Sequence, residues 1–142
     1  MRLKGLHKLD KDKTIKWLLI AAAVIYTAVF LYLTVIGRRS YHGSHIQLEP
    51  FWSYKVPGEY RQIVYNILFF IPYGAILYLC FKKKWQVIVT ALALSVTVEV
   101  LQYVCRVGLC EIDDIIHNTL GVIIGMFAAV LIKKIISKYI TK

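Results

Sequence analysis

The sequence predicts an all-α membrane protein, a bundle of four transmembrane helices with one long outer loop between the first and second helices. Hydrophobic residues make up 58% of the 142 residues, and the mean hydropathy is +0.60. Soluble globular domains contain about 45–50% apolar residues. The excess gathers in runs of about 20 residues, the length that crosses a hydrocarbon core about 30 Å thick. These runs predict transmembrane helices at residues 17–36, 63–81, 85–104 and 113–132.

Two other architectures fit the sequence less well. A soluble four-helix bundle would carry a polar stripe along each helix, whereas residues 17–36 contain no charge and no such stripe. A cleaved signal peptide has an apolar region of only about 7–15 residues, followed by a small-x-small cleavage site. Residues 17–36 form a longer run, and no such site follows before Gly37, so we expect them to remain as the first helix. The chain length then fits a single membrane domain, residues 1–142.

Lysine and arginine residues are distributed unevenly between the two ends of the predicted helices. With four spans, 13 of the 18 basic residues fall on the side of the two termini, and five fall on the side of residues 37–62. Basic residues collect in the cytoplasmic loops of membrane proteins. The sequence therefore predicts a multi-pass plasma-membrane protein with both termini cytoplasmic and residues 37–62 outside. This topology, together with attraction to anionic lipids, explains the net charge of +10. No nucleic-acid-binding motif is visible, so no nucleic-acid partner is expected.

The other connections between the predicted helices are short. Residues 1–16 are expected to form a basic tail before the first helix, and residues 82–84 a tight turn on the inner side. Residues 105–111 are expected to form the second outer connection. Gly108 lies within it, and a glycine there would let the chain reverse its direction.

Polar side chains are concentrated where three of the predicted helices reach the outer side. The candidate pocket residues are Asn66 in the second helix, Glu99, Gln102 and Arg106 in the third, and Asp114, His117 and Asn118 in the fourth. The spacing of three and four residues in the third helix places its members on one face. An acid within a membrane helix costs about 2.5–3.5 kcal/mol, so it normally faces the bundle interior or a water-filled cavity. The cluster predicts either an outward-facing pocket or an ion-paired core in which Arg106 neutralises Glu99 or Asp114.

Four motifs follow one another between about residues 45 and 130. They are Leu48-Glu49-Pro50-Phe51, the segment NILFFIPYG at residues 66–74, Glu99-x-x-Gln102, and Asp114-x-x-x-Asn118-Thr119-Leu120-Gly121-x-x-x-Gly125. In this order they resemble the VanZ-like family, which is named for a protein associated with resistance to the glycopeptide antibiotic teicoplanin. The resemblance implies an integral membrane protein of the bacterial cell envelope. The chain departs from the family pattern at Glu111, where the family often has Asp, and Asp113 and His117 fall outside the pattern.

Several residues of these motifs have a structural explanation. Pro72 lacks an amide hydrogen and is expected to kink the second helix, while Gly74 lets a neighbouring helix approach. The pair Gly121-x-x-x-Gly125 is typical of a helix-packing face in membranes. These glycines therefore predict close contact between helices rather than a chemical role.

The long outer loop is rich in aromatic residues. Aromatic rings favour the headgroup level of a bilayer, so we expect this loop to lie on the membrane or over the pocket. The residues assigned to such a lid are Pro50, Phe51 and Trp52.

Cysteines and acids near the outer turn raise the question of a disulfide or a metal. Cys105 and Cys110 flank this turn, and their spacing is compatible with a disulfide or with two free thiols. A zinc site that adds His117 to them fits no common spacing. A hard cation would instead need the oxygen ligands of Glu99, Glu111 and Asp114. No metal and no cofactor is assigned from the sequence.

Three functions are compatible with these features. The first is a binding protein that takes an amphiphilic or lipid-linked envelope ligand in the outer-leaflet pocket and, as the resemblance implies, affects teicoplanin susceptibility. The second is a membrane-embedded enzyme acting on a lipid headgroup, with Glu99 beside His117 as acid and base, although no nucleophile motif such as G-x-S-x-G appears. The third is a small transporter, which polar residues confined to one leaflet argue against. We expect the binding protein, with membrane lipids and the envelope ligand as partners. No oligomeric state and no catalytic residue is assigned.

Overall fold

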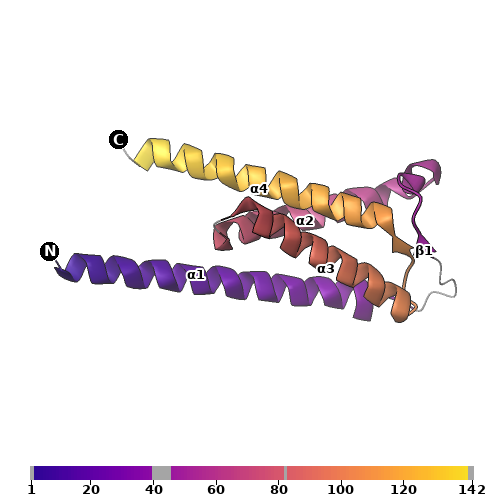
Figure 1. Cartoon of the computed structure of the whole chain (residues 1–142), viewed down its shortest axis with the longest axis horizontal. Coiled ribbons are helices and arrows are strands. Elements are labelled where there is room, and N and C mark those ends of the chain that lie inside the picture. The colour runs from indigo at the N-terminus through magenta and orange to yellow at the C-terminus, as the bar shows by residue number, and fades with distance from the viewer. Residues whose placement is uncertain (1, 40–45, 82, 141–142) are drawn as a thin grey trace.

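The computed structural model describes residues 2–39, 46–81 and 83–140 of the chain. Figure 1 shows four long helices lying side by side, with both termini at one end of the bundle. Their bounds are Arg2–Leu31 for α1, which continues as a π-helical turn at Tyr32–Ile36, Tyr60–Cys80 for α2, Lys84–Val104 for α3 and Ile112–Ile140 for α4. At the opposite end lie the short strands β1, Ile46–Gln47, and β2, Cys110–Glu111, and a 3-10 turn at Trp52–Lys55.

Each of the four helices is long and apolar enough to cross a membrane, which confirms the predicted fold class. The candidate spans are Lys13–Ile36, Tyr60–Cys80, Lys84–Val104 and Ile112–Tyr139. Two boundaries differ from the sequence prediction. Residues 2–16 continue α1 as helix instead of forming an irregular tail, and α4 extends about eight residues beyond 132. Both extensions are rich in Lys and Leu or Ile, residues that a helix accommodates readily, so the apolar run alone underestimated the helix lengths.

The closest helix contact in the bundle joins α2 to α4. A Cβ atom added at Gly125 would lie 1.8 Å from the carbonyl oxygen of Ile71, and one added at Gly121 would lie 2.3 Å from that of Ile67. On the α2 side, a Cβ atom at Gly74 would lie 2.3 Å from the carbonyl oxygen of Val122. Distances this short leave no room for any side chain. The packing role predicted for these glycines is therefore confirmed, and α2 continues past Pro72 to the end of this contact.

Helix α1 packs more loosely than the other three. Only 6% of its most apolar window is buried inside the bundle, and in Figure 1 it runs along one edge with α3 between it and α4. Its contacts are aromatic: Phe30 packs edge-on against Phe70 with ring centroids 4.9 Å apart, and Tyr26 stacks on Tyr73 at 5.7 Å. Such pairs contribute about 0.5–1.5 kcal/mol beyond their buried area. They therefore hold the outer half of α1 against α2.

A two-stranded parallel sheet joins the long loop to the α3–α4 connection. Ile46 is paired with Cys110, and Gln47 is paired with Glu111. Gly108 does not take the left-handed conformation that a chain reversal was expected to need. The positive φ of 55° belongs to Arg106 instead. Gly108 is buried, and a Cβ atom there would lie 3.1 Å from Nη1 of Arg38 and 3.3 Å from Oε1 of Gln102, so this glycine makes room for two polar side chains.

We expect Gly125→Ala to lower the thermal unfolding midpoint of the detergent-purified protein. Overpacking costs typically about 1–3 kcal/mol, and here the added methyl would meet a backbone carbonyl that cannot rotate away. Ile124→Ala, at the neighbouring exposed position, is the matched control and should leave the midpoint nearly unchanged. An unchanged midpoint for Gly125→Ala would mean that the two backbones are farther apart than described.

Candidate functional site

Buried polar side chains gather at the end of the bundle that is opposite the termini. Nine of them are no more than 6% exposed: Ser53, Ser95, Glu99, Gln102, Glu111, Asp113, Asp114, His117 and Asn118. The α3 members are spaced by four and three residues on one face, and the α4 members occupy the first two turns of that helix. Burying polar groups is costly unless they find hydrogen-bond partners. Their partners therefore indicate what the cluster does.

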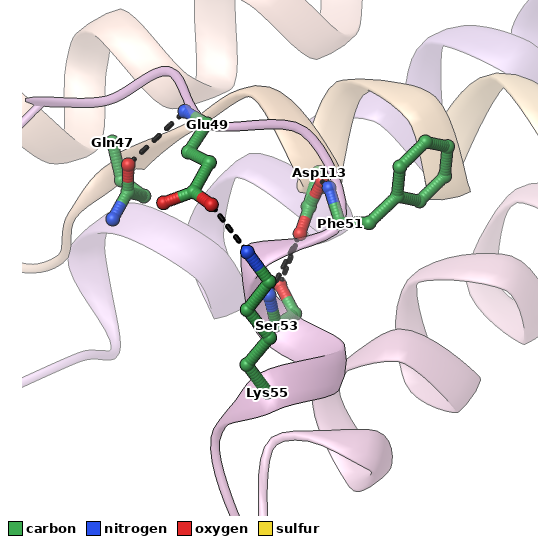
Figure 2. Close-up of polar contacts among 6 residues, drawn as sticks. All are labelled: Gln47, Glu49, Phe51, Ser53, Lys55 and Asp113. Carbon is green, nitrogen blue, oxygen red and sulfur yellow. Dashed lines mark hydrogen bonds and ion pairs between the residues drawn. The ribbon is translucent and has the colours of Figure 1, made fainter.

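Asp113 fixes the conformation of the long loop, as Figure 2 shows. Its Oδ1 accepts a hydrogen bond of 2.6 Å from the backbone N–H of Phe51. Its Oδ2 accepts one of 2.8 Å from the N–H of Ser53 and one of 2.7 Å from the Ser53 hydroxyl. Phe51 has a left-handed φ of 63°, a conformation that costs about 1–3 kcal/mol outside glycine. Three hydrogen bonds to one carboxylate offset this cost and hold the loop against α4.

Two further contacts in Figure 2 stabilise the loop on its solvent side. The amide N–H of Glu49 donates to Oε1 of Gln47 at 3.1 Å, and the ammonium of Lys55 pairs with the carboxylate of Glu49. Both members of the ion pair are more than half exposed. Exposed pairs of this kind contribute only about 0–1 kcal/mol, so Asp113 rather than this pair is the main anchor of the loop.

Three other acids share a second hydrogen-bond network. Oε2 of Glu99 accepts a hydrogen bond of 2.9 Å from the backbone N–H of Glu111. The side-chain amide of Gln62, in the first turn of α2, lies 3.2–3.3 Å from both carboxylate oxygens of Asp114 and 3.3 Å from Oε2 of Glu111. Within the part of the chain that the structure describes, no cation lies within 4.0 Å of any of these carboxylates. Among the described residues the network is therefore held by amide donors and not by a direct ion pair.

Glu111 lies in the connection between α3 and α4, and the pKa of its carboxyl is close to neutral pH. Burial, together with the neighbouring acids Asp114 and Glu59, raises the pKa of its carboxyl from 4.5 to about 7, and Arg38 opposes this rise. A carboxyl with a pKa of about 7 gains or loses its proton in response to a nearby charge. A positively charged group placed beside Glu111 would hold it ionised.

A polar cavity of about 210 Å³ opens beside this network. The side chains that line it are Arg38, Glu59, Gln62, Gln102, Val107, Leu109, Glu111 and Asp114, together with Gly108. Gln102 also donates a hydrogen bond of 3.2 Å to the carbonyl of Thr34, which connects the cavity to the end of α1. Three carboxyl groups and one guanidinium face the same small space. The cavity therefore favours a group that donates hydrogen bonds or carries positive charge.

The remaining polar residues lie beside the cavity rather than in its lining. His117 shares a hydrogen bond of 3.0 Å between its Nε2 and the Tyr54 hydroxyl, and Asn118 donates one of 2.9 Å to Ser95. Among the residues that the structure describes, three buried side-chain atoms have no hydrogen-bond partner: Nδ2 of Asn66, Nδ1 of His117 and Oδ1 of Asn118. Unpartnered buried atoms are rare in proteins and mark places where a ligand or water completes the bonding.

The structure brings together most, though not all, of the residues that the sequence grouped. Gln102 and Asp114 line the cavity, while Glu99, His117 and Asn118 are buried outside its lining and Asn66 is half-buried. Arg106 does not join them, because its side chain is exposed in the turn after α3, where the backbone leaves the helical path. The basic residue at the cavity is Arg38. Pro50, Phe51 and Trp52 do not line this cavity either, because Asp113 holds their segment to one side of it.

Four polar residues of the lining were not among the predicted pocket residues: Arg38, Glu59, Gln62 and Glu111. Gln62 stands one helical turn before Asn66 on α2, so its i, i+4 spacing was a usable signal. In the sequence, Glu111 is a departure from the family pattern and one ligand of the possible hard-cation site, but not a predicted pocket residue. Arg38 carried no signal that distinguished it from Arg39.

Metal binding and disulfide formation find no support in the geometry. Among the residues that the structure describes, no group of three or more His, Cys, Asp or Glu side chains is arranged to hold a metal ion. Cys80, Cys105 and Cys110 are not bridged to one another.

Comparison with known proteins gives a clear family match. The model of the VanZ/LLP1 family matches residues 17–133. Protein VanZ of Enterococcus faecium is 30% identical over 109 residues, an alignment that covers 72% of this chain and 64% of the relative. The chain thus spans somewhat less than two thirds of the length of that relative. No solved structure matches the chain.

We expect Asp113→Asn to loosen the loop. The amide nitrogen of asparagine would face an N–H or hydroxyl donor, so at least one hydrogen bond to a charged acceptor, worth about 1.5–3 kcal/mol, would be lost. Hydrogen exchange of the Phe51 and Ser53 amides should then accelerate by about tenfold or more. Glu49→Gln, which removes only the exposed ion pair, is the control and should leave these amides protected. Equal exchange in both variants would contradict the role of Asp113 as anchor.

Proposed function

Because the chain belongs to the VanZ/LLP1 family, we propose that it is an envelope membrane protein whose polar cavity binds the head of an amphiphilic or lipid-linked ligand. The observation that carries the proposal is the lining of the cavity. Glu59, Glu111 and Asp114 face it with only Arg38 as a basic neighbour. Three acidic side chains outnumber this single guanidinium, and a ligand with an amine or several hydroxyl donors would compensate the acidic groups that it leaves unpaired. The tail of such a ligand would remain among lipid chains.

The ligand would reach the cavity from the outer leaflet. Both termini lie at the end of the bundle opposite the cavity (Figure 1), and 13 of the 18 basic residues accompany the termini and the α2–α3 turn. The positive-inside rule then assigns the terminal end to the cytoplasm. The cavity would thus open at the outer face of the bacterial plasma membrane, where lipid-linked envelope precursors and lipophilic antibiotics are found.

Membership of the VanZ/LLP1 family supports the proposal that this chain affects teicoplanin susceptibility. The aligned segment includes the α2, α3 and α4 residues that form the cavity, since the family match extends from residue 17 to residue 133. We propose that occupancy of the cavity is what lowers susceptibility. The outer loop, held by Asp113, would limit how far the ligand extends along the surface.

A membrane-embedded enzyme acting on a lipid headgroup is the alternative. It would use Glu99 and His117 as acid and base. However, Glu99 is engaged by the backbone of Glu111, Nε2 of His117 is engaged by Tyr54, and neither residue lines the cavity. These contacts favour binding over catalysis.

Expression in a sensitive Gram-positive host tests the proposed function. We expect the wild-type chain to raise the inhibitory concentration of teicoplanin several-fold, and that of vancomycin, which lacks an acyl chain, much less. Asp114→Asn and Glu111→Gln should abolish this protection at equal membrane levels, because each keeps its size but loses its charge. Glu49→Gln, an exposed acid outside the cavity, should protect like the wild type. Full protection by both cavity variants would refute the cavity as the active element.

Cysteine labelling in intact cells tests the orientation. In a chain whose native cysteines are replaced by serine, Lys55→Cys should react with an impermeant thiol reagent, since Lys55 is exposed in the outer loop. Lys138→Cys, exposed near the end of α4, should react only after the membrane is permeabilised. The reverse pattern would place the cavity on the cytoplasmic side.

A further inference from the structure

A second cavity lies at the end of the bundle that carries the termini, far from the acidic cluster. It has a volume of about 700 Å³ and lies between α1, the end of α2 and the start of α3. Three lysines from three different elements face it: Lys16 of α1, Lys83 of the α2–α3 turn and Lys133 of α4. No acidic residue is found among the described residues that line it. The charged residues that line this cavity are therefore all cationic.

An apolar groove continues from this cavity along α1. The groove has a volume of about 690 Å³ and shares Lys16, Cys80 and Phe81 with the cavity, so the two are continuous. Along α1 its lining extends from Lys16 to Leu31. Fifteen residues of helix rise about 22 Å, which exceeds the roughly 15 Å depth of one leaflet of a 30 Å core. An extended acyl chain fits such a groove over its whole depth in the leaflet.

Loose packing of α1 explains why the groove exists. The side of α1 that faces it carries the small residues Ala23 and Ala28, which do not fill the space in front of Tyr73 and Leu77 of α2. Between these two alanines Tyr26 stacks on Tyr73, and Phe30 contacts Phe70 nearer the outer end of the helix. The space left beside Ala23 and Ala28 is lined mainly by apolar side chains and leads directly to the lysines of the cavity.

We propose that this continuous site binds one anionic phospholipid, with the phosphate against Lys16, Lys83 and Lys133 and an acyl chain in the groove between α1 and α2. Charge complementarity selects the occupant, because an uncharged or zwitterionic lipid would leave three ammonium groups without a matching charge. Basic pockets between transmembrane helices recognise anionic lipid heads in this way. The bound lipid would fill the gap beside α1 and hold the inner half of that helix against the bundle. The site is independent of the outer cavity and shares no residue with it.

Binding of phosphatidylglycerol to the detergent-purified full chain, followed by native mass spectrometry, tests the proposal. We expect saturable binding of one phosphatidylglycerol and none of phosphatidylcholine with the same chains. The triple variant Lys16→Gln, Lys83→Gln, Lys133→Gln should bind on the order of a hundredfold more weakly, since each lysine near a lipid head contributes a factor of about five. The matched control Lys13→Gln, Lys134→Gln, Lys138→Gln removes the same charge from exposed positions outside the cavity and should bind like the wild type.

A second variant tests the contribution of the groove to lipid binding separately from that of the three lysines. Ala23→Phe with Ala28→Phe fills the groove and should weaken binding of long-chain phosphatidylglycerol while leaving that of the dihexanoyl form unchanged. Inorganic phosphate at the same concentration should not displace the lipid. If both triple lysine variants bound phosphatidylglycerol equally weakly, the effect would come from diffuse surface charge, and the proposed site would be wrong. Equal binding of phosphatidylcholine, or full long-chain binding by the alanine variant, would overturn it as well.

Discussion

The contact between the backbones of α2 and α4 determines how the rest of the structure is arranged. Gly121 and Gly125 lie against the carbonyl oxygens of Ile67 and Ile71, so the two parallel helices keep a fixed register along their length. Two turns before Gly121, the same register places Asp114 beside Gln62 at the first turn of α2. In a membrane, where lipid chains are as apolar as side chains, such close packing replaces the hydrophobic effect as the source of association. The buried acids therefore depend on glycines that lie deeper in the bundle.

Much of the fold could be predicted because membrane insertion is a constraint on composition. A span needs about 20 apolar residues and leaves few alternatives, so four runs give four helices. The small-residue face of α4 could be predicted as well, because glycines spaced like Gly121 and Gly125 in an apolar helix are typical of a helix-packing face. The predicted helix ends were less accurate, because residues 2–16 and 133–140 carry many charges and still continue the helices that they adjoin.

The cavity could be predicted only in part, for reasons that particular residues make clear. Helical spacing puts Glu99 and Gln102 on one face correctly, but it does not extend to Arg106, since the left-handed turn at that residue takes its side chain away from the face. Arg38 reaches the cavity across the end of α1, a long-range contact without any local pattern. The pairing of β1 with β2 involves two residues on each side, too few to leave an alternating signature. Aromatic content predicted that the loop would be near the membrane surface, but its position depends on long-range contacts: the hydrogen bonds to Asp113, the contact of Tyr54 with His117 and the β1–β2 pairing.

Asp113 and Asp114 are neighbours in sequence and serve different parts of the molecule. Successive residues of an α-helix point about 100° apart, so Asp113 faces the loop and accepts its amides, while Asp114 faces α2 and the cavity. The two tasks are thereby separated within one helical turn. A substitution that changes what Asp113 holds would therefore rearrange the outer loop without changing the charge of the cavity.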